Sequence, residues 1–208
     1  HYKNYADWLK SCPAGHLDSR MLEADLMFRR IGITFAVYGE GENTERLIPS
    51  DPVPRIISAS EWEFLEKGLE QRVTALNMFL HDVYHDGKIF KDGIIPAEKI
   101  YKNAQFQPCM MGLDLPKQIY SHISGVDIIR NSDGNYYVLE DNLRVPSGVS
   151  YMLQNRRMSQ RLFPELFDRY QVLPVERYPS LLRQTLSECS FYHTPTIVVL
   201  TPGPYNSA

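Results

Sequence analysis

The 208-residue sequence is poor in cysteine, in long apolar runs and in excess charge of either sign. Its three cysteines, Cys12, Cys109 and Cys189, lie far apart without metal-ligand spacing. We therefore expect reduced thiols of a cytoplasmic protein, with no disulfide framework. No run of eighteen apolar residues is present, so we expect no membrane span. A formal net charge of −3 gives no electrostatic case for nucleic-acid binding, which usually needs a basic face.

The common signatures of phosphate and zinc sites are also missing. Residues 38–42, YGEGE, have neither the GxGxxG spacing nor the lysine of a P-loop, so this loop is either a plain turn or a binding loop. His81 and His85 are four residues apart on a predicted helix, but the glutamate of an HExxH motif is absent between them. The two histidines share a helix face as some zinc ligands do, but the sequence gives little support for a zinc site.

The sequence predicts a mixture of helices and strands, which favours an α/β or α+β fold class. The expected helices span residues 18–30, 58–86, 96–102, 150–170 with a break at Pro164, and 179–188. In the first helix we expect Met21, Leu22 and Leu26 to face the core, with Phe28 at the rim. Strands are expected at residues 33–38 and 195–201, and the second reads as a buried strand of a parallel sheet.

Residues 119–142 carry the strongest local signal, a β-hairpin. Two alternating apolar runs flank Asp133-Gly134, a pair of residues typical of a two-residue hairpin turn. In that register the numbers of paired residues sum to 267, which places Asp127 opposite Glu140 and Ile129 beside Val138. Asn142 projects from the same face as Glu140.

Two carboxylates opposite each other repel and weaken a sheet unless a cation lies between them. Asp127, Glu140 and Asn142 offer the oxygen ligands that Mg²⁺ prefers, commonly together with substrate phosphates. The hairpin is therefore a candidate half of a Mg²⁺–nucleotide site. Solvated surface acids, or acids paired with a nearby arginine, are alternatives, and a one-residue bulge at the turn would place the two acids on opposite faces.

The segment after the hairpin, residues 144–150, leads into a predicted helix. Main-chain N–H groups at a helix N-terminus and serine hydroxyls suit anionic oxygens, so Ser147, Gly148 and Ser150 are candidate phosphate ligands. Arg144 is a candidate fixed positive charge for phosphoryl transfer. The alternative is that Ser147 or Ser150 merely caps the helix.

Arg55 lies in the proline-framed segment 51–55. Its rigid surroundings suit a side chain that binds an anionic substrate, while an ion pair with Asp51 or Glu61 is the alternative.

With these residues in hand, the sequence resembles the circularly permuted ATP-grasp family, relatives of the ATP-grasp domain of glutathionylspermidine synthase. The resemblance lies in residues 28–57, 66–89, 122–156 and 198–208, so it covers nearly the whole chain. It implies an ATP-grasp-like, circularly permuted α/β fold, of which this chain would be only the N-terminal part. Residues 1–190 would form the ATP-grasp-like portion, and residues 191–208 would include the first strand of a following α/β portion.

The resemblance implies ATP-dependent ligation of a small-molecule or peptide carboxylate to an amine through an acyl phosphate. It implies ATP and Mg²⁺ as cofactors, with Asp127, Glu140 and Asn142 as metal ligands. Arg144, Ser147 and Ser150 match the family's phosphate-binding or substrate-binding segment, and Asn155 and Arg156 would extend that site. A non-catalytic nucleotide-binding or scaffold module and a kinase-like phosphotransferase are the rival functions. The sequence does not specify the oligomeric state.

Overall fold

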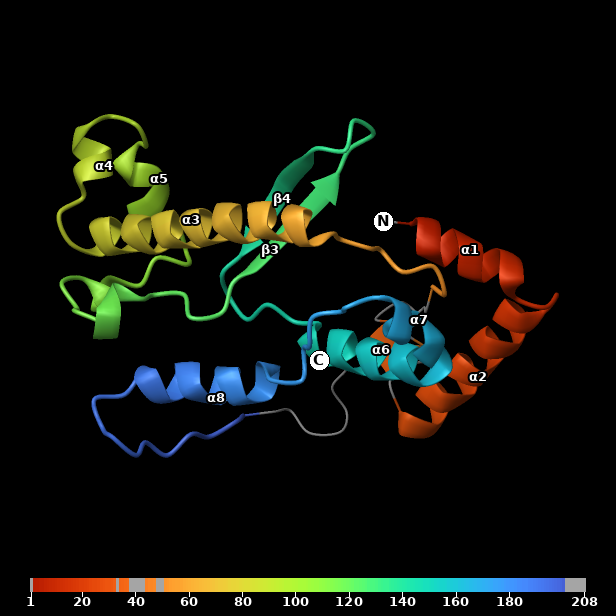
Figure 1. Cartoon of the computed structure of the whole chain (residues 1–208). Helices are drawn as coiled ribbons and strands as arrows, with labels where there is room; N and C mark the ends of the chain where they lie inside the picture. The colour runs from red at the N-terminus through yellow and green to blue at the C-terminus, as the bar shows by residue number, and fades with distance from the viewer. Residues whose placement is uncertain (1, 33, 38–43, 48–50, 201–208) are drawn as a thin grey trace. The chain divides into compact units, whose positions relative to one another are not determined.

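The computed structural model describes residues 2–32, 34–37, 44–47 and 51–200 (Figure 1). The chain divides into two compact units. Unit 1 takes residues 1–58, 147–180 and 198–208, and unit 2 takes residues 59–146 and 181–197. Among the described residues, no helix has both the length and the apolar character that crossing a membrane requires.

Unit 1 is mainly helical. It contains α1 (Lys3–Ser11), α2 (His16–Ile31), α6 (Val149–Leu162) and α7 (Pro164–Arg169), with an antiparallel pair formed by β1 (Thr34–Val37) and β2 (Thr44–Leu47). Its core joins α1 and α2 to α6 and α7 through Tyr5, Trp8, Ala24, Phe28, Met158, Leu162, Phe163 and Leu166. The expected break at Pro164 is confirmed, because α6 ends at Leu162 and α7 restarts at Pro164.

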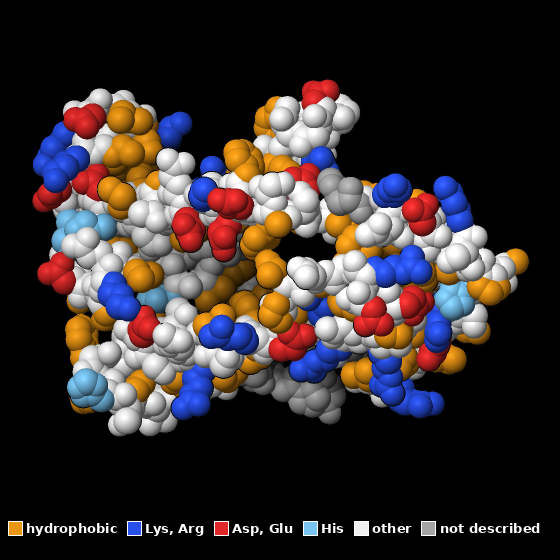
Figure 2. Space-filling model, in the orientation of Figure 1, with side chains coloured by type: hydrophobic (Ala, Val, Ile, Leu, Met, Phe, Trp, Pro, Cys, Tyr) orange, Lys and Arg blue, Asp and Glu red, His pale blue; other side chains and the backbone are white. Residues whose placement is uncertain are grey.

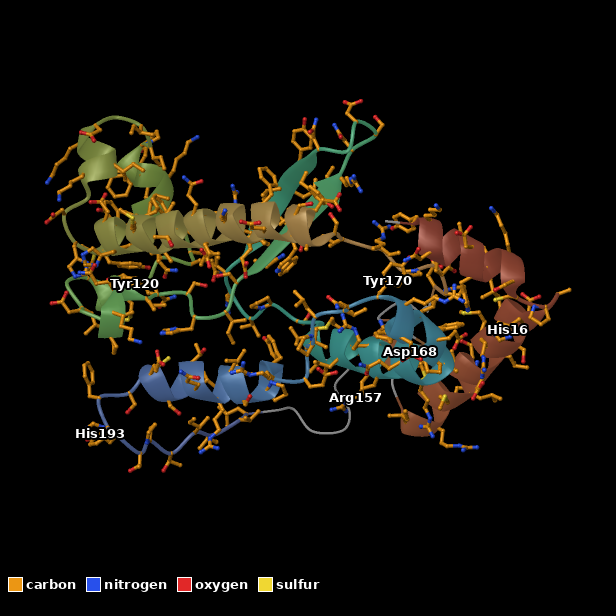
Figure 3. All side chains as sticks on the ribbon, in the orientation of Figure 1. His16, Tyr120, Arg157, Asp168, Tyr170 and His193 are labelled. Carbon is orange, nitrogen blue, oxygen red and sulfur yellow. The ribbon has the colours of Figure 1, made fainter. Side chains whose placement is uncertain are left out.

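Aromatic contacts tie α1 to α7 in this core. The rings of Trp8 and Phe163 meet edge-on at 5.7 Å, and the Trp8 indole N–H donates to Glu165 Oε1 at 3.2 Å. The Tyr5 N–H donates to the hydroxyl of Tyr170, which Figure 3 labels, at 2.9 Å. Helix α1 was not predicted from the sequence, although Tyr5, Trp8 and Cys12 have helical spacing.

The expected inner face of α2 is wrong. Leu22 and Leu26 are 63% and 58% exposed, while Ala24 and Phe28 are completely buried. The helix itself is confirmed and ends at Gly32, whose φ of +75° suits a glycine C-terminal cap. The error arises because the face of Ala24 and Phe28 packs against Met158 and Leu162 of α6, a long-range contact that periodicity alone does not specify.

Unit 2 is built around the long helix α3 (Ala59–Tyr84) and the hairpin of β3 (Gly125–Arg130) and β4 (Tyr136–Asn142). Short elements follow α3: α4 (Lys88–Lys91), α5 (Ala97–Tyr101), η1 (Pro108–Met110) and η2 (Pro116–Gln118). Helix α8 (Tyr178–Glu188) begins in unit 1 and continues into unit 2. The helices expected at 58–86, 96–102 and 179–188 are confirmed within a few residues.

The apolar side chains of unit 2 are only partly covered. Leu65 and Val83 of α3 are buried, whereas Trp62 and Phe64 are 40% and 69% exposed. Orange apolar side chains are accordingly visible among charged ones on the face drawn in Figure 2.

The strand expected at residues 195–201 is not formed in its described part, residues 195–200. Val198, Val199 and Leu200 are 70%, 77% and 91% exposed. A strand needs a hydrogen-bonded neighbour, and within the described residues this segment has none. The assignment of residues 191–208 to a following α/β portion stays a prediction.

Candidate metal and nucleotide site

The hairpin places Asp127 directly opposite Glu140, as the sequence predicts, but by a different route. The Asn131 N–H donates to Asn135 O at 2.9 Å, which leaves a three-residue loop at 132–134 in place of the expected two-residue turn. Gly134 has a φ of +83°, the left-handed conformation that such a loop requires at this position. This loop shifts the register by one residue near the turn.

A β-bulge between the turn and the acids reverses the shift. Ile128 pairs with Val138 whereas Asp127 pairs with Glu140, so Leu139 is the extra residue on β4. The expected Ile129–Val138 pairing is wrong, because Ile129 pairs with Tyr137 on the turn side of the bulge. The acid pairing survives because the two irregularities compensate.

Helix α3 occupies one face of the hairpin. Arg72 of α3 binds Asp141 through Nε–Oδ1 at 2.7 Å and Nη2–Oδ2 at 2.6 Å. Arg130 of β3 pairs with Glu61 of α3 at 3.0 Å. Hydrogen bonding to Arg72, with its positive charge, lowers the pKa of Asp141 below the usual carboxyl value.

The predicted metal ligands lie on the opposite face. Side chains alternate along a strand, so Glu140 and Asn142 point away from the face that carries Asp141. Asp127, Glu140 and Asn142 are all exposed. The structure therefore brings these three predicted residues together on the hairpin face that α3 does not cover.

The hydrogen bonds at this face leave oxygen atoms available for a cation. Asn142 Nδ2 donates to Glu140 Oε1 at 3.1 Å, which orients the Asn142 amide and leaves its Oδ1 for a ligand. Within the part of the chain that the structure describes, the Asp127 carboxylate has no hydrogen-bond or ion-pair partner. The nearby Arg72 and Arg130 are engaged by other acids, so neither neutralises the Asp127–Glu140 pair.

This donor set fits a hard divalent cation. It provides two carboxylates and an amide oxygen, the ligand types of Mg²⁺ sites that also use substrate phosphates. Among the described residues, no three His, Cys, Asp or Glu side chains form a cluster suited to a metal. The hairpin set has only two carboxylates, so it depends on Asn142 and on oxygens from a ligand.

Polar contacts fix the open end of the hairpin, where these ligands lie. Asn77 Oδ1 of α3 accepts the main-chain N–H groups of Tyr120 at 2.8 Å and Ser121 at 2.9 Å; Figure 3 labels Tyr120. The buried Ser121 hydroxyl contacts Leu143 O at 3.3 Å and so joins the two ends of the hairpin. Neither residue was predicted as part of the site, although an asparagine among the apolar residues of α3 was an available signal.

The chain leaves the hairpin in a strained turn beside the candidate metal ligands. Val145 has a φ of +48°, which is rare and costly for a β-branched residue. A Cβ added to Gly125 would lie 2.8 Å from Pro146 Cβ, so only glycine permits this approach of the turn to β3. The predicted phosphate ligand Arg144 is exposed, and its Nη1 donates to Gln105 Oε1 at 2.8 Å.

The remaining candidate residues belong to unit 1. Helix α6 starts after Gly148, which has a φ of +98° and is the N-terminal capping residue. Ser147 and Ser150 are exposed, and no side chain among the described residues caps this helix. The alternative that either serine serves as a cap is therefore wrong.

Asn155, Arg156 and Arg55 differ in how far they are engaged. Asn155 Oδ1 is buried without a hydrogen-bond partner among the described residues, an uncommon state for a polar atom. Arg156 Nη1 donates to Leu173 O at 2.7 Å, which gives this side chain a structural role within unit 1. Arg55 is exposed and makes no ion pair with the described residues, so pairing with Asp51 or Glu61 is not seen.

His81 and His85 lie side by side on α3. Their rings stack at 4.1 Å, and Nδ1 of His81 lies 3.1 Å from the Tyr120 hydroxyl. Nδ1 of His85 lies 2.9 Å from the main-chain oxygen of His81. Asp114 Oδ1 is 3.4 Å from His85 Nε2, so an ion pair forms there when His85 is protonated.

Comparison with known proteins identifies the family. Residues 54–208 match the profile of a family described as "a circularly permuted ATPgrasp". An uncharacterised protein of Synechocystis sp. is 43% identical over 205 residues, covering 97% of this chain and 42% of that protein. An uncharacterised protein of Mycobacterium leprae is 44% identical over 209 residues, covering 100% of this chain and 36% of that protein.

A more distant relative carries an enzyme name. A Frankia casuarinae protein named "Putative glutamate–cysteine ligase 2-2" is 35% identical over 210 residues, covering 100% of this chain and 24% of that protein. The chain thus spans about two fifths or less of the length of these three relatives. Its mixed helices and small antiparallel sheets correspond to part of the family's fold. The chain belongs to the circularly permuted ATP-grasp family.

Proposed function

We propose that this chain supplies the metal-binding part of an ATP-dependent carboxylate–amine ligase of the glutathionylspermidine-synthase-like type. The observation that carries the proposal is the exposed Asp127–Glu140 pair, with Asn142 beside it and no cationic side chain between the two acids among the described residues. Such a pair costs stability in a sheet unless a cation joins it. Membership of an ATP-grasp family implies that ATP is the nucleotide whose phosphates the cation would contact.

In the proposed reaction a carboxylate oxygen attacks the γ-phosphorus of ATP, forming an acyl phosphate and releasing ADP. The amine nitrogen then attacks the acyl carbon, phosphate leaves, and the nitrogen loses a proton as the amide forms. Mg²⁺ bound by Asp127, Glu140 and Asn142 would offset the negative charge of the phosphates. The residues of this chain otherwise bind and orient the reactants.

The other candidate residues have proposed roles in binding. Arg144 would hold the transferring phosphate, since its guanidinium is exposed and oriented by Gln105. Strain at Val145 supports a functional turn, because strained main chain concentrates at binding sites. Ser147, Gly148 and Ser150 would bind anionic oxygens at the uncapped start of α6.

Three further side chains would complete the binding roles. Asn155 would accept a hydrogen bond from the bound molecule through its unpartnered oxygen. Arg156 uses one of its five N–H donors in the hydrogen bond to Leu173 O, so its other N–H donors could bind a ligand. Arg55 would orient the acidic substrate. The name of the Frankia casuarinae relative suggests amino-acid-like carboxylates and amines as the first substrates to screen.

A calorimetric titration of Mg·ATP into the intact protein tests the proposal. We expect wild-type binding that requires Mg²⁺ and weakens sharply in Glu140→Gln. Asp133→Asn is the matched control, because it removes an exposed acid at the turn of the same hairpin and should leave binding unchanged. Wild-type protein that folds but binds no Mg·ATP would contradict the proposal.

Product analysis separates the ligase from its rivals. A ligase consumes ATP only with both substrates and yields ADP, phosphate and an amide in equal amounts. A kinase-like enzyme would yield ADP and a stable phosphorylated product without an amide. A nucleotide-binding or scaffold module would consume no ATP with any acid and amine.

A further inference from the structure

The side chain of Arg72 reaches β4 at the residue between two candidate metal ligands. Its guanidinium forms a two-pronged contact with Asp141, which lies between Glu140 and Asn142 in the chain. Because side chains alternate on a strand, whatever fixes Asp141 on one face also fixes the direction of its two neighbours on the other. Arg72 thus controls the orientation of β4 without touching the metal ligands themselves.

The packing between α3 and the hairpin leaves an open groove. A groove of about 560 Å³ separates the two elements, lined by side chains that include Leu69, Leu76, Ile128 and Tyr136. The two ion pairs from α3 engage the hairpin on either side of the bulge: Arg72–Asp141 at its open end and Arg130–Glu61 near its turn. The bulge interrupts the ladder between them, so the open end is held by the Arg72–Asp141 pair together with the Asn77 and Ser121 contacts described above. Of these, the Arg72–Asp141 pair reaches β4 between the two candidate ligands.

We propose that Arg72 is a positioning residue, which acts through Asp141 to hold Glu140 and Asn142 toward the bound cation. This inference rests on the proposed function, because it assigns a role to a residue behind the proposed metal site. It differs from a general stabilising role, since it assigns the effect to the open end of the hairpin and not to the turn.

Simple electrostatics and positioning predict opposite results when Arg72 is replaced. Removing a nearby positive charge should strengthen the binding of a cation if charge alone matters. Loss of positioning should weaken binding, because the ligands no longer share one orientation. Replacement of residues that orient metal ligands typically costs about 10–100-fold in affinity, and an indirect contact belongs near the lower end of that range.

Arg130→Met is a close control for Arg72→Met. Each change removes the arginine of an ion pair that joins α3 to the hairpin. The side chains of Arg72 and Arg130 are equally exposed, at 42%. The carboxylate partners are also similar, with Asp141 16% and Glu61 18% exposed. The two pairs lie on opposite sides of the bulge, and Arg130 also donates from Nε to Gly134 O at 3.2 Å and lies over the Tyr136 ring at 5.6 Å. Arg130→Met therefore removes more contacts at the turn than its ion pair alone, which makes it a strict control for an effect confined to the open end.

The experiment is a Mn²⁺ titration of the intact protein with ATP present, followed by electron paramagnetic resonance, together with hydrogen–deuterium exchange of β4. We expect Arg72→Met to weaken Mn²⁺ binding about tenfold and to speed exchange at residues 140–142. Arg130→Met should change the Mn²⁺ affinity less than twofold, which corresponds to a change in binding free energy below about 0.4 kcal/mol. Swapping the charges in Arg72→Asp/Asp141→Arg should restore part of both readouts relative to Arg72→Asp alone.

The outcomes distinguish this inference from the function on which it rests. Unchanged or tighter Mn²⁺ binding by Arg72→Met, with normal wild-type binding, overturns the positioning role alone. Equal weakening by Arg72→Met and Arg130→Met also overturns it, because the effect would then be general destabilisation. A wild-type protein that binds no Mn²⁺ overturns the proposed function and this inference together.

Discussion

Replacing Glu140 with glutamine should stabilise the metal-free protein while removing its affinity for Mg·ATP. In the metal-free hairpin, Glu140 lies opposite Asp127, and both carboxylates are exposed to solvent. Glutamine has nearly the same shape and keeps an oxygen to accept the Asn142 Nδ2–H, which Glu140 Oε1 accepts at 3.1 Å. The change therefore removes repulsion without removing that hydrogen bond.

The magnitude follows from the cross-strand geometry. Two unit charges about 5 Å apart repel by about 0.8 kcal/mol at the dielectric constant of water. Screening with a Debye length of about 8 Å at physiological ionic strength reduces this to roughly 0.4 kcal/mol. That lies within the roughly 0.2–1 kcal/mol range of cross-strand pair effects. For a protein of this size it corresponds to a rise in Tm of about 1–2 °C.

Thermal unfolding with a chelator, and then with Mg·ATP, measures both effects. Glu140→Gln should have the higher Tm in chelator, and its advantage should shrink at high salt because the repulsion is screened. With Mg·ATP the order should reverse, because ligand binding raises the Tm of the wild type only. Asp133→Asn, the control at the turn, should show neither effect.

A lower Tm for Glu140→Gln in chelator would refute the reasoning about the acid pair. It would mean that the Glu140 carboxylate stabilises the metal-free hairpin. Asp127→Asn offers an independent check, because it relieves the same repulsion from the opposite strand and should also raise the Tm.

Three further perturbations test how the hairpin is held. Asn77→Ala should lower the free energy of unfolding by about 2 kcal/mol in urea titrations. The main-chain N–H groups of Tyr120 and of the buried Ser121 both lose their acceptor in this variant. A loss below about 0.5 kcal/mol would contradict this. Gly125→Ala should destabilise by about 1–3 kcal/mol in the same assay, because its Cβ would lie 2.8 Å from Pro146 Cβ. Because the pKa of Asp141 is lowered in the folded protein, its ion pair with Arg72 stabilises the fold fully above the usual carboxyl pKa. That stabilisation is lost as the pH falls through the lowered pKa. In acid-unfolding measurements, Asp141→Asn should lack this part of the pH dependence of the unfolding free energy.

The sequence determined the elements of the fold better than their contacts. The helices α2, α3, α6 and α8 follow from apolar spacing and proline positions, which depend on neighbours in the chain. The buried face of α2 does not, because Ala24 and Phe28 became core residues only when α6 packed on that side. The apolar run at 195–200 shows the same limit, since a strand requires a partner that local sequence does not provide.

By itself, the sequence predicted that Asp127 and Glu140 pair, because alternation and the Asp-Gly turn restrict a hairpin to a few registers. Only the tertiary structure decided how that pairing arises, through a three-residue loop that the bulge at Leu139 compensates. It also decided which face is covered, because Arg72 binds Asp141, a residue 69 positions further along the chain. Local patterns set the order of side chains along a strand, whereas contacts between distant residues determine which of its faces remains open to a ligand.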